Sequence, residues 1–151
     1  MIRIIVVGSI KEKYLKEAIE EYKKRISKYS NIEIIELKDE GYVEADKAKI
    51  LEGKKILKYL NGKDYIITTE IEGCQLSSTE FSDKIEHILI ENSNITFIIG
   101  GSYGLSEEIK ALSNYRLSFS KMTLPHQLFR AILLEQIYRA FKIINNESYH
   151  K

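Results

Sequence analysis

The sequence predicts an α/β domain with a mostly parallel sheet and helices on both of its faces. Short apolar runs alternate five times with longer helical patterns, which is typical of parallel strands joined by crossover helices. The first of these runs is apolar at nearly every position, as expected for a strand that is covered on both sides. The 151 residues have the length of one ordinary domain and contain no repeat or linker. We therefore expect a single domain over residues 1–151.

The first part of the chain predicts two strands and two helices. Residues 2–7 form the near-continuous apolar run, and residues 13–28 form an amphipathic pattern with many charges on its outer face. A second strand is predicted at residues 32–37. A polar stretch then leads into a helix from about residue 45 to residue 60, which Asn61-Gly62 ends.

The rest of the chain continues the alternation. Ser77 to Glu80 fit a capping box, which opens a helix that runs to about Glu91. Pro125 stands where prolines commonly begin helices, and the long helix after it runs to about Ile144. The remaining predictions are strands at 65–71, 95–99 and 116–119, and a short helix at 106–112.

Composition excludes several classes of protein. The 23 basic and 22 acidic residues give a net charge of +1, which neither indicates nor excludes a nucleic-acid partner. The single cysteine excludes an internal disulfide, and the three widely spaced histidines have no metal-ligand spacing, so we expect no metal. No apolar stretch approaches the ~20 residues that cross a bilayer. We expect a soluble, cytoplasmic protein that does not enter a membrane.

The segment IIGGSYGL, residues 98–105, contains the pattern G-x-S-x-G that marks nucleophilic serines in hydrolases. A hydrolase also needs an acid and a histidine on later strand-end loops, but only one short strand follows Ser102 and no aspartate does. The dinucleotide fingerprint should follow the first strand, where Gly8 stands alone. The glycines at 100, 101 and 104 could instead let a flat ligand approach the main chain, or they could simply end a strand.

Ligands of open α/β sheets bind beyond the carboxyl ends of the strands. This rule points to three loops, which follow Ile71, Ile99 and Phe119. The third loop is rich in small polar residues and leads directly into the helix that begins after Pro125.

The last helix carries two arginines on opposite faces. His126 and Arg130 are an i, i+4 pair on one face, whereas Arg139 lies half a turn round from Arg130. Arg139 could also form a simple helix ion pair with Glu135. Two arginines on opposite faces of an apolar helix favour a helix at a subunit interface, so we expect a homodimer. The tail Tyr149-His150-Lys151 could fray, or it could stack on a base and contact phosphate.

Three segments together resemble a known family. The segments FIIGGSYGLS, LSFSKMTLPHQLFRAILLEQIYRAF and SYHK, with the opening IRIIVVG and the EIEG of Glu70 to Gly73, are similar to the RlmH (YbeA-like) family of large-subunit ribosomal RNA methyltransferases. The resemblance covers essentially the whole chain. It implies a SPOUT-type α/β knot, in which the C-terminal segment forms a trefoil, a topology that ordinary folds avoid.

The resemblance also implies an activity and a site. The activity is methyl transfer from S-adenosylmethionine to N3 of a pseudouridine in the helix 69 loop of 23S ribosomal RNA on assembled ribosomes. Among the implied residues, His126 and His150 could handle the proton, Arg130 or Arg139 could stabilise charge on the uracil oxygens, and Tyr149 could stack on the base. The implied cofactor residues are Thr69, Gly100, Gly101, Phe119, Ser120, Lys121, Met122, Thr123 and Leu124. A nucleotide- or RNA-binding module without catalysis is the alternative.

Overall fold

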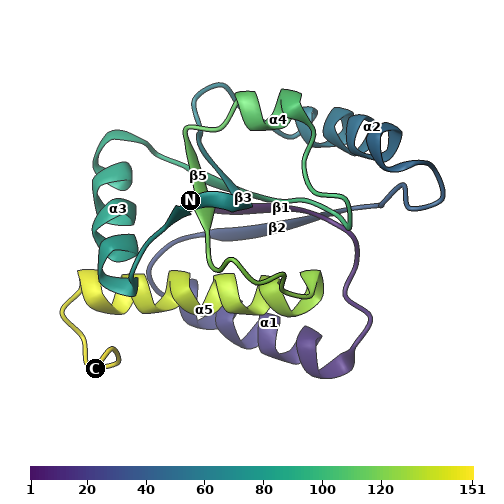
Figure 1. Ribbon diagram of the computed structural model, residues 1–151. Coiled ribbons are helices and arrows are strands. Elements are labelled where there is room, and N and C mark those ends of the chain that lie inside the picture. The colour runs from purple at the N-terminus through teal and green to yellow at the C-terminus, as the bar shows by residue number, and fades with distance from the viewer.

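The computed structural model describes residues 1–151 as a five-stranded parallel sheet with helices on both faces (Figure 1). The strand order is β2-β1-β4-β3-β5, and every neighbouring pair is parallel. The strands are β1 (Ile2–Val7), β2 (Ile32–Leu37), β3 (Tyr65–Gln75), β4 (Ile95–Ile99) and β5 (Tyr115–Ser118). The helices are α1 (Lys13–Ile26), α2 (Ala45–Leu57), α3 (Ser78–Glu91), α4 (Glu107–Ala111) and α5 (His126–Ile144).

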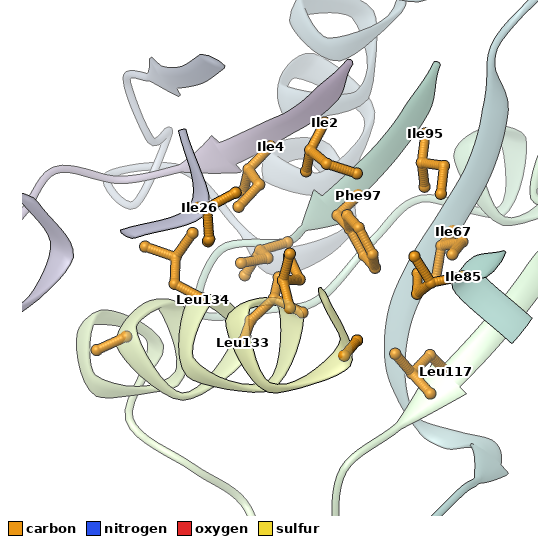
Figure 2. Packing of buried hydrophobic residues seen from close by; sticks show 14 of the residues in the cluster. Ile2, Ile4, Ile26, Ile67, Ile85, Ile95, Phe97, Leu117, Leu133 and Leu134 are labelled. Carbon is orange, nitrogen blue, oxygen red and sulfur yellow. The ribbon is translucent and has the colours of Figure 1, made fainter. Parts of the chain in front are cut away.

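The helices divide into two layers. The helices α1, α3 and α5 lie on one face of the sheet, and α2 and α4 lie on the other (Figure 1). Successive strand residues point to opposite faces, so Ile4 of β1 joins the larger core under α5 while Ile5 joins the smaller core under α2 and α4. Figure 2 shows the larger core, in which Phe97 of β4 lies between strand isoleucines and Leu133 of α5. The continuous apolar run of β1 is thereby explained, because both of its faces are buried.

The observed elements agree with the predicted α/β class and differ from the predictions mainly at their ends. The predicted strands at 2–7, 32–37 and 95–99 have the observed bounds. The strand β3 is longer than predicted, because it resumes pairing with β5 at Cys74 after a register shift that follows Thr69. The capping box is confirmed, since the Ser77 hydroxyl accepts from the Glu80 N–H at 3.1 Å and Glu80 accepts from the Ser77 N–H at 2.7 Å. The trefoil knot stays a prediction.

Two features of this fold position the site. The helix α5 packs between α1 and α3, which fixes its long axis against the sheet (Figure 1). The strands β4, β3 and β5 are consecutive in the sheet, so the loops that leave their carboxyl ends must lie side by side. None of the five helices is apolar over a length that would cross a membrane.

Candidate functional site

The bulged part of β3 and the loops that follow β4 and β5 surround one cavity at the carboxyl edge of the sheet. Its volume is about 380 Å³, which is the size of a small-molecule site. The sequence singled out the loops after β4 and β5, whereas the loop expected after Ile71 is part of β3, which continues to Gln75. Eight of the predicted cofactor residues line the cavity: Thr69, Gly100, Gly101, Phe119, Ser120, Met122, Thr123 and Leu124. The ninth, Lys121, is exposed and is not among the lining residues.

A tight turn after β4 forms one wall. The Gly104 N–H donates to the Gly101 carbonyl at 3.0 Å, and Gly104 has a φ of +84°, which favours glycine. A side chain on Gly100 would place its Cβ only 2.8 Å from the Gly104 carbonyl carbon. These glycines therefore close the turn, and their bare main chain faces the cavity.

Ser102 lies at the exposed tip of this turn. Its hydroxyl hydrogen-bonds to no histidine and no carboxylate, so the geometry of an activated serine is absent. The G-x-S-x-G pattern thus arises from the sterics of the turn and does not indicate a nucleophile.

A bulge in β3 forms the second wall. Thr69 pairs with Leu117 of β5 before the bulge, and Cys74 pairs with Leu117 after it. The chain can return this closely only because residue 73 is glycine, where a Cβ would lie 2.8 Å from the Arg116 carbonyl oxygen. The Thr69 hydroxyl donates to the Ile98 carbonyl at 3.0 Å, so this side chain is tied to β4.

The bulge also brings the carboxylate of Glu70 to the cavity. Glu70 was not among the predicted site residues. Glu70 has a side chain that is only 5% exposed, and it accepts from the Thr68 hydroxyl at 2.7 Å. Lys110 and Arg116 lie 3.7 Å and 3.6 Å from its carboxylate oxygens. Its place in EIEG, directly at a predicted strand end, is the signal that could have identified it. The other charged lining residues are Lys49, Glu72 and Lys110.

The third wall is the loop between β5 and α5. The rings of Phe119 and Phe129 meet edge to face with centroids 5.0 Å apart, and both line the cavity. The Ser120 hydroxyl accepts from the Met122 N–H at 2.9 Å, which shapes the loop locally. This side of the cavity therefore combines two aromatic rings with small polar side chains, whereas the bulge side is charged.

The first of the predicted catalytic residues, His126, lies at this cavity. It is the first residue of α5, is exposed, and lines the cavity beside Phe129. Arg130 does not share this placement, although it follows His126 by one helical turn. Its side chain is 2% exposed, and its guanidinium donates to Glu36 at 2.7 Å and to the Gly8 carbonyl at 3.2 Å, at the ends of β1 and β2.

The other predicted catalytic residues form a second cluster at the far end of α5. Glu135 accepts from Arg139 at 2.6 Å and from the Tyr149 hydroxyl at 3.1 Å. Arg139 also lies 3.1 Å from Nδ1 of His150 and 4.8 Å from the centre of the Tyr149 ring. Burial raises the pKa of the Tyr149 hydroxyl, and the hydrogen bond to Glu135 raises it further. The tail is thus folded back onto α5.

The predicted catalytic residues are therefore split within one chain. His126 and Arg139 are 13 residues apart on α5, which corresponds to about 20 Å at 1.5 Å per residue. Only His126 shares the cavity with the predicted cofactor residues. No group of three or more histidine, cysteine, aspartate or glutamate side chains is placed to hold a metal ion.

The chain is similar to known methyltransferases over its whole length. Residues 1–150 match the family described as "Predicted SPOUT methyltransferase". A protein from Methanococcus maripaludis (strain C5) is 55% identical and one from Clostridium botulinum (strain 657) is 53% identical, each alignment covering 99% of both chains. The names of both contain the words "ribosomal RNA large subunit methyltransferase H".

A solved structure shares the fold at low sequence identity. It is a "probable methylase family protein" from Haemophilus influenzae Rd KW20, with a TM-score of 0.57 and 14% identity. The match covers 99% of this chain and 70% of that one.

Proposed function

Because the chain belongs to the SPOUT methyltransferase family, we propose that it transfers a methyl group from S-adenosylmethionine to large-subunit ribosomal RNA. The observation that carries this proposal is the cavity at which the β3 bulge and the loops after β4 and β5 meet. The names of the relatives supply the RNA substrate. Within that RNA, the acceptor is N3 of a pseudouridine in the helix 69 loop of assembled ribosomes.

The residues of the cavity fit S-adenosylmethionine. The cavity volume of about 380 Å³ suits a small molecule such as S-adenosylmethionine. Phe119 and Phe129 offer apolar walls to a flat adenine, and the glycine turn offers main-chain groups. Glu72 offers negative charge to a cationic ligand, whereas Glu70 is already paired with Lys110 and Arg116. When bound, the cofactor supplies an activated methyl group on a sulfonium.

The contribution of the protein is alignment and proton handling. Methyl transfer is an in-line displacement, so a large part of the rate enhancement comes from holding the acceptor nitrogen in line with the methyl group. N3 of pseudouridine carries a proton at neutral pH and must lose it before it attacks. His126 is the predicted catalytic residue at the cavity, where its imidazole can accept this proton.

A second copy of the chain completes the site. In one chain Arg139, Tyr149 and His150 lie about 20 Å along α5 from His126. In a homodimer with α5 near the interface, these residues of the partner reach the mouth of the cavity. There Arg139 stabilises negative charge on the uracil and Tyr149 stacks on the base.

The experiment has a binding arm and a transfer arm. Calorimetry measures S-adenosylmethionine and S-adenosylhomocysteine on the purified protein, and we expect both to bind. Mass spectrometry of helix 69 then follows methylation of ribosomes from cells that lack the gene. We expect one new methyl group, on N3 of a pseudouridine, with the wild type and with Ser102→Ala, and strongly reduced transfer with His126→Ala.

The outcomes separate the possible functions. Binding without any methyl transfer would support the alternative of a nucleotide-binding module. Methylation of another nucleotide would contradict the substrate assignment and keep the enzyme class. Failure of both ligands to bind would contradict the enzyme assignment itself.

A further inference from the structure

Glu52 of α2 is a buried carboxyl group directly behind the glycine turn. The residue is 3% exposed, and its Oε2 accepts from the Glu40 N–H at 2.9 Å. Its Oε1 is buried and has no hydrogen-bond partner. A Cβ on Gly101 would lie 3.1 Å from this oxygen, so Glu52 packs against the main chain of the turn.

The next residue of α2 holds the other end of the same segment. A Cβ on Gly53 would lie only 2.6 Å from the hydroxyl oxygen of Ser106. Ser106 is in turn the N-cap of α4 and accepts from the Ile109 N–H. Glu52 and Gly53 therefore contact both ends of residues 101–106, and α2 forms the support on which the turn rests.

The charges around Glu52 favour its neutral form. Lys55, on the same helix, already pairs with Glu40 at 2.5 Å and donates to the Lys38 carbonyl. From the preceding loop, Asp39 and Glu40 place negative charge near Glu52, while Val7 and Gly101 carry no ionisable side chain. An ionised Glu52 would be a buried charge whose neighbouring cation, Lys55, is already paired with Glu40, which is costly.

Burial raises the pKa of Glu52, although the Glu40 N–H opposes this effect. The raised pKa means that Glu52 stays neutral to a higher pH than an exposed glutamate. It loses its proton only as the pH rises through the raised pKa. A contribution to stability or binding that requires neutral Glu52 is therefore fully present at low pH. It is lost as the pH rises through the raised pKa.

We propose that Glu52 is a positioning residue whose neutral carboxyl packs against Gly101 and holds the turn in the conformation that binds the cofactor. On ionisation the carboxylate is drawn toward water and Lys55 and away from Gly101, and the turn loses its support. The proton on Glu52 and the ligand at the turn are thereby linked. This inference rests on the proposed function only for the identity of the ligand.

The test compares wild type with Glu52→Gln. Glutamine has nearly the same shape as the glutamic acid side chain and cannot ionise. Calorimetry measures S-adenosylhomocysteine binding between about pH 4 and about pH 8, a range that begins below the usual glutamate pKa and extends well above it. We expect equal affinities at the low end, and at the high end wild type at least about fivefold weaker than Glu52→Gln. Every ionisable group other than Glu52 is present in both proteins and so cancels in the comparison. Glu44→Gln, an exposed change just before α2, should follow wild type throughout.

A second measurement needs no ligand. Hydrogen exchange at the amides of Gly101 and Ser102 should be the same in wild type and Glu52→Gln at low pH, and faster in wild type at high pH. Equal exchange and equal affinity of the two proteins at every pH would overturn the positioning role. If wild type binds neither cofactor form, the proposed function fails, and the exchange rates still decide the role of Glu52.

Discussion

Gly100 is the residue of the turn with the least room for a side chain. Its missing Cβ would meet the Gly104 carbonyl carbon at 2.8 Å and the carbonyl oxygen at 2.9 Å, and main-chain atoms cannot rotate away as a side chain can. We expect Gly100→Ala to open the turn and to weaken S-adenosylhomocysteine binding at least tenfold, or about 1.4 kcal/mol. Calorimetry of S-adenosylhomocysteine binding to Gly100→Ala and wild type measures this loss. Gly62→Ala is the matched control, because nothing lies within 4 Å of that Cβ position, and unchanged binding in both variants would contradict the role of the turn.

Residues of the site differ in how far the sequence could predict them. The glycine turn could be found because its steric needs are written in consecutive residues at a strand end, whereas Phe119 was implied by the family resemblance. Glu52 could not be predicted as a site residue, because its role depends on packing against Gly101, which is 49 residues away in the sequence. Arg130 shows the same limit, since its partner Glu36 lies on β2 and no helical periodicity reveals it.

At the scale of the element, a change at the start of α3 should lower the stability of the protein without weakening cofactor binding. The capping box of Ser77 and Glu80 satisfies two main-chain N–H groups at the start of the helix. Ser77→Ala removes one acceptor and should destabilise the protein by about 1 kcal/mol. Thermal unfolding should show a fall of roughly 2–4 °C in Tm.

The same variant should bind S-adenosylhomocysteine as wild type does, because α3 contributes no residue to the cavity. Glu44→Gln at the N-cap of α2 serves as the control for stability, since that side chain makes no capping hydrogen bond. A tenfold loss of affinity in Ser77→Ala would show that α3 positions the site.

Elements were predicted well where local patterns decide them. Burial of β1 on both faces produces a continuous apolar run, and the box at Ser77 fixes where α3 begins. The end of β3 was not predicted, because the chain leaves β5 at Thr69 and rejoins it at Cys74. That return depends on the close approach of Gly73 to Arg116, which is a tertiary contact.

At the scale of the whole molecule, the arrangement along α5 raises the question of how one site is assembled. His126 lines the cavity at the start of the helix, whereas Glu135 holds Arg139 and Tyr149 near its end. The two groups are fixed on one rigid helix, so no rotation of side chains brings them together. A site that uses both groups therefore needs a second chain.

Mixed dimers test this assembly directly. One variant is His126→Ala, and the other lacks residues 149–151. If each site takes His126 from one chain and the tail from its partner, both homodimers are inactive in methyl transfer. After random mixing about half of the dimers are mixed, and each of these has one complete site, because a two-fold symmetric interface repeats the same contacts. Methyl transfer to ribosomes should then return to about a quarter of the wild-type rate. Each variant refolded alone is the control. A mixture that stays inactive, although light scattering shows dimers, would mean that each chain builds its site alone.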